Sequence, residues 1–305
     1  MKLAERFHRA RFDWEVRALK DTPPLQRGSD DFIALSMVQH RDVLPYLLAL
    51  KSFARFLTPV RVVLVADPTL DSNDRSLLRR HVPHIEIREA AEFQRPGIPK
   101  GGCWERLGAI SHCNSEGYVI QLDADTVAVA DLPAVRDALR NGTSFTLGTE
   151  DVQPIQTCAE IAAWAKGRLD GNDHVQLIAE CALADFDPEC AFRYARGCAG
   201  FAGFARGSIN PDRVLDVSRR MAPLLGDLWT GWGTEQFTSN LLVCSSPGAS
   251  LLPHPAYCAP TRIKPHTVFL HFIGYARYRS PLYAQLARRV GQDLKAGALA
   301  QRHAA

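Results

Sequence analysis

Strand-like segments alternate with helix-like stretches along the first half of the chain. Four segments have the length and side-chain pattern of strands: 32–38, 61–66, 84–87 and 118–122. Three helices are predicted between them, over 42–56, 72–80 and 101–114. Strands and helices that alternate in this way are typical of a parallel sheet covered by helices. The first half is therefore predicted to form a βαβαβ unit.

The second half of the chain is less regular. Further strands are predicted at 144–149, 200–206 and 267–272, and helices over 155–183, 211–225 and 235–244. Residues 185–196 are first acidic and then aromatic, and they predict irregular structure. Because no repeat or linker interrupts the chain, we expect one α/β domain over 1–279, with a mostly parallel central sheet flanked by helices and an elaborated C-terminal half. A basic helical tail is expected over 280–305.

Size and charge narrow the class of function. The 305 residues are 46% hydrophobic, which is sufficient for a full core. The 36 basic and 33 acidic residues nearly cancel, so the net charge of +3 gives no reason to expect a nucleic-acid partner. A catalytic or binding pocket is the better expectation.

Cysteines and terminal segments bear on the compartment. Residues 1–16 lack the apolar stretch of a signal peptide, and no segment is long and apolar enough to cross a bilayer. The eight cysteines show no C-x-x-C or zinc-like spacing, which favours reduced thiols and a cytoplasmic location. The basic residues of the tail predict either a solvated helix or weak membrane-surface association: Arg288, Arg289, Lys295 and Arg302.

A pair of aspartates closes the strand at 118–122. Residues two apart project to the same side, so both carboxylates of Asp123-Ala124-Asp125 can face one cation. The carboxyl ends of strands in such sheets line the ligand crevice. The second D-x-D, at 185–187, has no strand to fix its geometry, and we interpret it as a loop. Solvated turn aspartates are the alternative interpretation of Asp123 and Asp125.

Residues 123–127 also fit the D-x-D-x-[TV] nucleophile motif of haloacid-dehalogenase-type phosphatases, with Asp123 as the nucleophile. Those enzymes resemble one another in a later basic lysine and a paired-aspartate metal motif. Only Lys166, Lys264 and Lys295 follow in this chain, and no aspartate pair comes after any of them. Such a phosphatase stays an alternative hypothesis.

Short motifs stand in a fixed order along the chain, on both sides of Asp123-Ala124-Asp125. Lys51-Ser52 and Arg106-Leu107 precede it, and the motifs that follow are Cys198-Ala199-Gly200, Glu235-Gln236 with Asn240, and His271-x-x-Gly274-x-x-Arg277. This order resembles family 8 of the retaining glycosyltransferases, which have the Rossmann-like GT-A fold and use nucleotide-sugar donors. Differences from the family pattern include Cys198, where asparagine is usual, Phe237, where aspartate is usual, and Arg277, where lysine is usual. Gln39 and His40 also stand where aspartates are usual, Glu235 stands for an aspartate, and Tyr278-Arg279 replaces Pro-Trp.

The resemblance implies a divalent metal held by Asp123, Asp125 and His271. Two carboxylates and an imidazole suit manganese, with magnesium as the other choice. The resemblance also implies a UDP-sugar donor and the residues that bind it: Ser36, Val38, Gln39, Arg106, Ala124, Gly274 and Arg277. The plainer alternatives are a core histidine at 271, a surface arginine at 277 and a surface salt bridge at Arg106.

Glu235 and Gln236, with Arg106, are the candidate catalytic residues. At a predicted helix start their plainer role is capping. We expect Glu235 to orient a sugar hydroxyl and Gln236 to lie behind the anomeric carbon. Because a glutamine is a poor nucleophile, front-face transfer with retained configuration is favoured.

The acceptor is expected to be a hydroxyl of a carbohydrate or another molecule. Variable loops within 151–196, Glu150 and the tail are the expected acceptor regions. Trp229 and Trp232 either stack on an acceptor sugar or pack inside the protein. A non-catalytic nucleotide-sugar-binding protein and a nucleotidyltransferase are further hypotheses, although the latter's G-x-G-x-R loop does not follow the first strand.

Overall fold

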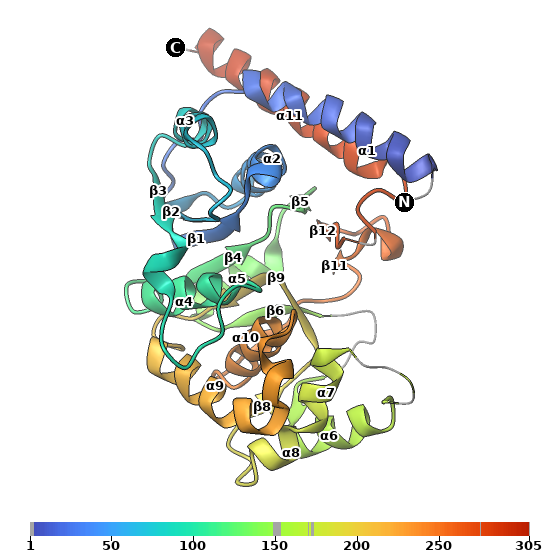
Figure 1. Cartoon of the computed structure of the whole chain (residues 1–305). Coiled ribbons are helices and arrows are strands. Elements are labelled where there is room, and N and C mark those ends of the chain that lie inside the picture. The colour runs from blue at the N-terminus through green and yellow to red at the C-terminus, as the bar shows by residue number, and fades with distance from the viewer. Residues whose placement is uncertain (1–2, 149–153, 170, 172–173, 275, 305) are drawn as a thin grey trace.

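The computed structural model describes residues 3–148, 154–169, 171, 174–274 and 276–304. The predicted acceptor residues Glu150 and Asp151 lie outside the described residues. A seven-stranded sheet runs through the centre in the order β10-β6-β9-β4-β1-β2-β3, and only β9 is antiparallel to its neighbours (Figure 1). The predicted α/β fold with a mostly parallel central sheet flanked by helices is therefore confirmed.

The strands and helices have definite bounds. The central sheet consists of β1 (Asp30–Val38), β2 (Pro59–Ala66), β3 (Ile85–Glu89), β4 (Val119–Leu122), β6 (Phe145–Gly148), β9 (Gly197–Phe204) and β10 (Ser250–Leu251). Two small sheets consist of β5 (Thr126–Ala128), β11 (Tyr257–Cys258) and β12 (Phe269–His271), and of β7 (Gln156–Thr157) and β8 (Arg193–Tyr194). The longer helices are α1 (Leu3–Glu15), α2 (Val43–Ala54), α3 (Ser72–His81), α4 (Trp104–Cys113), α5 (Pro133–Asn141), α6 (Cys158–Lys166), α9 (Pro211–Leu225), α10 (Thr234–Cys244) and α11 (Leu282–Ala304). Shorter helical segments are α7 (Val175–Cys181), α8 (Leu183–Phe186), η1 (Val16–Asp21), η2 (His40–Asp42), η3 (Ala90–Phe93), η4 (Gly226–Thr230) and η5 (Pro260–Arg262).

Alternate side chains of the central strands pack into two hydrophobic cores. On β1, Phe32 and Ala34 face the core that contains α2, whereas Ile33 and Leu35 face the core that contains α4 and α10. This division follows from the two-residue period of a strand, in which successive side chains point to opposite faces. The near-continuous apolar run of β1 therefore reflects a strand buried on both sides.

The predicted helix over 155–183 is wrong as one element. α6 and α7 are separate helices, and the region predicted to be irregular contains α8 and β8. Gly167 follows α6 directly, which is consistent with a break because glycine is unfavourable inside a helix. The apolar content of the segment was interpreted correctly, but its continuity was not.

Two helices at the ends of the chain lie side by side as an outer layer (Figure 1). No helix was predicted at α1. One face of α11 belongs to the core that contains α2, through Tyr283, Ala287 and Val290. The tail is therefore not a fully solvated helix. No described helix is long and apolar enough to span a bilayer.

A buried polar cluster joins α2 to α3 and predicts a pH-dependent stability. The Lys51 Nζ donates hydrogen bonds to the Thr22 Oγ1 (2.8 Å) and the Pro23 carbonyl (2.6 Å), and lies 3.0 Å from the His81 Nδ1. Burial, together with the Lys51 ammonium, lowers the pKa of His81 to about 4. In the unfolded chain the imidazole of His81 takes up a proton near pH 6.5, whereas in the folded chain it stays neutral until the pH is close to 4. The contribution of His81 to stability is therefore full above pH 6.5 and is lost as the pH falls towards 4.

We expect His81→Gln to flatten the acid dependence of the free energy of unfolding. Between pH 6.5 and 4.5 the wild type should lose up to about 1.4 kcal/mol more per pH unit than the variant, because one proton is involved. Urea unfolding at several pH values measures this difference. His112→Gln, at an exposed position, is the control. An unchanged slope in His81→Gln would contradict the prediction.

Candidate active site

A cleft of about 580 Å³ opens at the edge of the sheet where β1 and β4 end. Its wall also includes the residues before α4 and α10 and the loop after β12. Most of the residues predicted for the site lie on this wall: Gln39, Arg106, Asp123, Ala124, Asp125, Glu235, Gln236, His271, Gly274 and Arg277.

The three predicted metal ligands converge at the floor of the cleft. Asp123 and Asp125 lie in the link between β4 and β5, and the Asp123 amide donates to the Gly200 carbonyl (2.9 Å). β12 pairs antiparallel with β5 and places His271 opposite Thr126. The ligand atoms of Asp123, Asp125 and His271 all lie within 4.8 Å of one another. Two carboxylates and an imidazole nitrogen form a suitable donor set for Mn²⁺ or Mg²⁺.

Asp125 is buried between His271 and Arg277. The His271 Nε2 lies 3.1 Å from the Asp125 Oδ1, and Arg277 hydrogen-bonds to the Asp125 Oδ2. Burial disfavours the charge of Asp125, but His271 and Arg277 outweigh it and hold the pKa of this carboxyl below its usual range. Asp125 therefore presents an ionised carboxylate to the cleft.

Two residues behind His271 fix its orientation. The Cys198 Sγ lies 3.3 Å from the His271 Nδ1, on the opposite side of the ring from Asp125. A Cβ on Gly200 would lie 2.1 Å from the His271 Cε1, so no larger residue fits there without moving the ring. The imidazole is thereby held with Nε2 towards the aspartates. Sequence reasoning found the position of Cys198 but not its contact with His271.

Arg106 is a buried bridge, not a surface residue. Its Nη1 lies 2.5 Å from the Asp123 Oδ1 and its Nη2 2.8 Å from the Glu235 Oε2. The Gln121 Nε2 also donates to the Asp123 Oδ1 (2.8 Å), a contact that no sequence signal indicated. The surface salt bridge considered for Arg106 is therefore excluded, and the guanidinium fixes two acids of the site at once.

Glu235 carries an unsatisfied oxygen. Its Oε1 is buried without a hydrogen-bond partner among the described residues. Burial raises the pKa of Glu235 to about 7, against the opposing effect of Arg106. Buried carboxylate oxygens in native proteins are normally hydrogen-bonded, so this atom is available for a ligand donor in the cleft.

Gln236 is held between β9 and α7. Its Oε1 accepts from the Ala199 amide (3.2 Å) and its Nε2 donates to the Gln176 Oε1 (2.9 Å). Of the two nearby tryptophans, Trp229 is buried, whereas Trp232 is 73% exposed and lines the cleft. Packing is therefore the role of Trp229, and Trp232 is free to meet a ligand.

Ser36 and Val38 were predicted to bind the nucleotide, and their side chains do not line the cleft. The Ser36 hydroxyl donates to the Leu122 carbonyl (2.6 Å), and Val38 is buried in the core that contains α2. Alternation along β1 turns Met37 and Gln39 towards the cleft instead. Asp42, which also lines the cleft, binds Gln39 (2.8 Å) through its carboxylate and makes no side-chain cap to α2.

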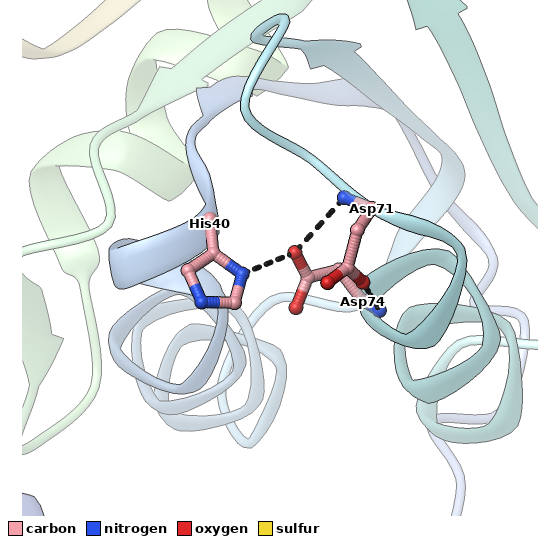
Figure 2. A group of neighbouring side chains, drawn as sticks. All are labelled: His40, Asp71 and Asp74. Atoms are coloured by element: carbon pink, nitrogen blue, oxygen red, sulfur yellow. Dashed lines mark hydrogen bonds and ion pairs between the residues drawn. The ribbon is translucent and has the colours of Figure 1, made fainter.

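A second group of His and Asp residues lies outside the cleft described above. Figure 2 shows Asp74 between His40 and the backbone amide of Asp71. The carboxylates of Asp71 and Asp74 form a capping box at the start of α3, and the Asp74 Oδ2 also binds the His40 Nδ1 (2.7 Å). These acids are therefore engaged as the N-cap of α3.

No protein-family model and no curated protein matches the chain in sequence. Among solved structures, the bifunctional glycosyltransferase WbbM is 13% identical, with a TM-score of 0.48, over 82% of this chain and 47% of that chain. The galactosyltransferase LgtC is 13% identical, with a TM-score of 0.44, over 84% of this chain and 95% of that chain. Mouse xyloside xylosyltransferase 1 is 13% identical, with a TM-score of 0.43, over 81% of this chain and 99% of that chain. The chain thus spans about half the length of WbbM. At this level of similarity the chemistry has to be argued from the cleft itself.

Proposed function

We propose that the chain is a metal-dependent glycosyltransferase of the GT-A type, which transfers a sugar from a nucleoside diphosphate sugar to an acceptor hydroxyl. The observation that carries this proposal is the convergence of Asp123, Asp125 and His271 within 4.8 Å in one cleft beside Arg277. The sequence resemblance to family 8 adds the choice of a UDP-sugar as donor.

Asp123, Asp125 and His271 would hold Mn²⁺ or Mg²⁺. A divalent cation bound there supplies Lewis-acid stabilisation of the diphosphate leaving group. Arg277 lines the cleft beside Asp125, and its guanidinium can neutralise further phosphate charge. A Cβ built on Gly274 would have no atom of a described residue within 4 Å, its chain neighbours apart, so its backbone is open to a diphosphate. This edge of the cleft therefore fits the diphosphate group.

The sugar is assigned to the side of the cleft formed by α10. Glu235 has a free oxygen to accept a bond from a sugar hydroxyl, and Arg106 fixes its other oxygen. Gln236, fixed by Ala199 and Gln176, offers an amide but no strong nucleophile to the anomeric carbon. Front-face transfer with retention is the mechanism that such residues support best, with the departing diphosphate accepting the acceptor proton. The exposed indole of Trp232 is proposed to meet the acceptor.

The proposal predicts metal-linked nucleotide binding. UDP and Mn²⁺ together should raise the melting temperature by several degrees more than either alone, because a ligand at 100 times its Kd stabilises by about 2.7 kcal/mol. GDP with Mn²⁺ serves as the comparison that tests whether the protein prefers uridine as the nucleotide base. Equal shifts with and without Mn²⁺ would contradict a metal-bridged diphosphate. Slow hydrolysis of UDP-sugars in the Mn²⁺ samples would separate an enzyme from a protein that only binds them.

A further inference from the structure

The outer face of α1 exposes large apolar side chains. Leu3, Phe7 and Trp14 are 85%, 65% and 71% exposed. At 100° per residue these three positions fall within one narrow stripe of the helix. Phe12, on the opposite side, is buried in the core that contains α2. The stripe is therefore the face of α1 that points away from the protein.

Basic side chains lie on the segment that carries this stripe. Arg6, Arg9, Arg17 and Lys20 are exposed. Arg9, Arg17 and Lys20 line one hollow of about 560 Å³, and the acids on its wall are Asp13, Asp42 and Asp74. Arg9 is paired only with Asp13, at 3.9 Å, and Arg17 and Lys20 show no ion pair within the described part of the chain. The segment also carries Glu5, Asp13, Glu15 and Asp21, but Arg17 and Lys20 have no ion pair among the described residues and add two such cations to the apolar stripe.

We propose that α1 and η1 dock the protein onto an anionic bilayer surface. The stripe of Leu3, Phe7 and Trp14 enters the boundary between headgroups and acyl chains, and Arg17 and Lys20 bind lipid phosphates. An apolar face bordered by cations is the pattern of helices that lie in a membrane interface. Charge complementarity favours an anionic bilayer over a second copy of the chain, because two copies that met at this face would place like cations next to each other.

The docking surface differs from the one that the sequence predicted. Weak membrane-surface association through the basic residues of the C-terminal tail stays a prediction, because Arg288 and Arg289 are exposed, although Tyr283, Ala287 and Val290 of α11 are buried in the core. Apolar side chains of α1, by contrast, are free. Because Gly274 and Arg277 also line the hollow, docking would bring the bilayer close to the cleft. The inference stands on α1 and does not require the proposed transfer reaction.

Vesicle co-sedimentation of the full chain tests the proposal. Binding is expected to vesicles of phosphatidylcholine with phosphatidylglycerol, and at least about 10-fold less to phosphatidylcholine alone or in high salt. Phe7→Ser with Trp14→Ser should lower binding by at least about 10-fold at an unchanged melting temperature, because both positions are exposed. Arg17→Gln with Lys20→Gln should remove the preference for anionic lipid.

Leu224→Ser with Leu228→Ser is the matched control, since these leucines are exposed elsewhere, at 43% and 48%. This control should bind vesicles like the wild type. The proposal would be overturned if the Phe7 and Trp14 variant bound anionic vesicles as well as the wild type does. A dimer in size-exclusion chromatography that this variant converts to a monomer would also overturn it, because the stripe would then be an interface between two copies.

Discussion

Asp125→Ala is expected to lower the rate of sugar transfer by about 1,000-fold and to remove the dependence of UDP binding on Mn²⁺. The Asp125 carboxylate supplies one of the three ligand atoms at the floor of the cleft and is also the partner of His271 and Arg277. A loss of about 4 kcal/mol of transition-state stabilisation, the scale of a missing Lewis acid, corresponds to this factor. Calorimetry of UDP with and without Mn²⁺ measures the metal-linked part directly.

The second D-x-D of the chain supplies the control for this experiment. Asp185 is exposed in the short helix α8, and Asp187, just after it, accepts the Ala191 and Phe192 amides of the following loop. Asp185→Ala should leave transfer and Mn²⁺-linked binding unchanged. If Asp125→Ala retained the Mn²⁺-dependent affinity of the wild type, Asp123, Asp125 and His271 would not be the metal site.

The parts of the site that could be predicted from the sequence depend on local rules. A buried strand ending in two aspartates places both at the carboxyl edge of the sheet, whatever the rest of the fold does. The meeting of His271 with Asp125 depends instead on the pairing of β12 with β5, two strands of three residues each. That pairing has no local signal, and only the motif order pointed to it.

The contacts that were missed depend on packing between distant segments. Cys198 stands where the resembling family has asparagine, and the sequence does not show that its sulfur faces the His271 Nδ1. Asp42 directly precedes α2, where an aspartate commonly caps a helix, but its carboxylate binds Gln39 and lies 3.5 Å from the Arg277 Nη1. A capping residue and an ion-pair residue have the same sequence signature. α1 was missed because it lacks the usual apolar face towards the core. Phe12 is the only residue of α1 that is fully buried, whereas the large apolar residues Leu3, Phe7 and Trp14 are exposed.

Gly200→Ala should weaken Mn²⁺ binding by about 10- to 100-fold, although Gly200 carries no ligand atom. The added methyl group would lie 2.1 Å from the His271 Cε1 and 2.5 Å from its Nε2. The ring must move, and it then loses its geometry towards both Asp125 and Cys198. Outer-shell residues that orient a metal-bound histidine have effects of this size. Calorimetric titration with Mn²⁺ measures the loss of affinity.

Gly274→Ala separates metal binding from diphosphate binding and is the comparison for Gly200→Ala. Apart from its chain neighbours, no described residue has an atom within 4 Å of the methyl group at 274, so His271 and the two aspartates stay in place and the affinity for Mn²⁺ should match the wild type. If the diphosphate approaches the backbone of Gly274, the same methyl group should lower the affinity for UDP in the presence of Mn²⁺ by about 10-fold. Equal loss of Mn²⁺ affinity in both variants would show that the metal site does not depend on the packing of Gly200 against His271. Unchanged UDP affinity in Gly274→Ala would instead move the diphosphate away from this loop.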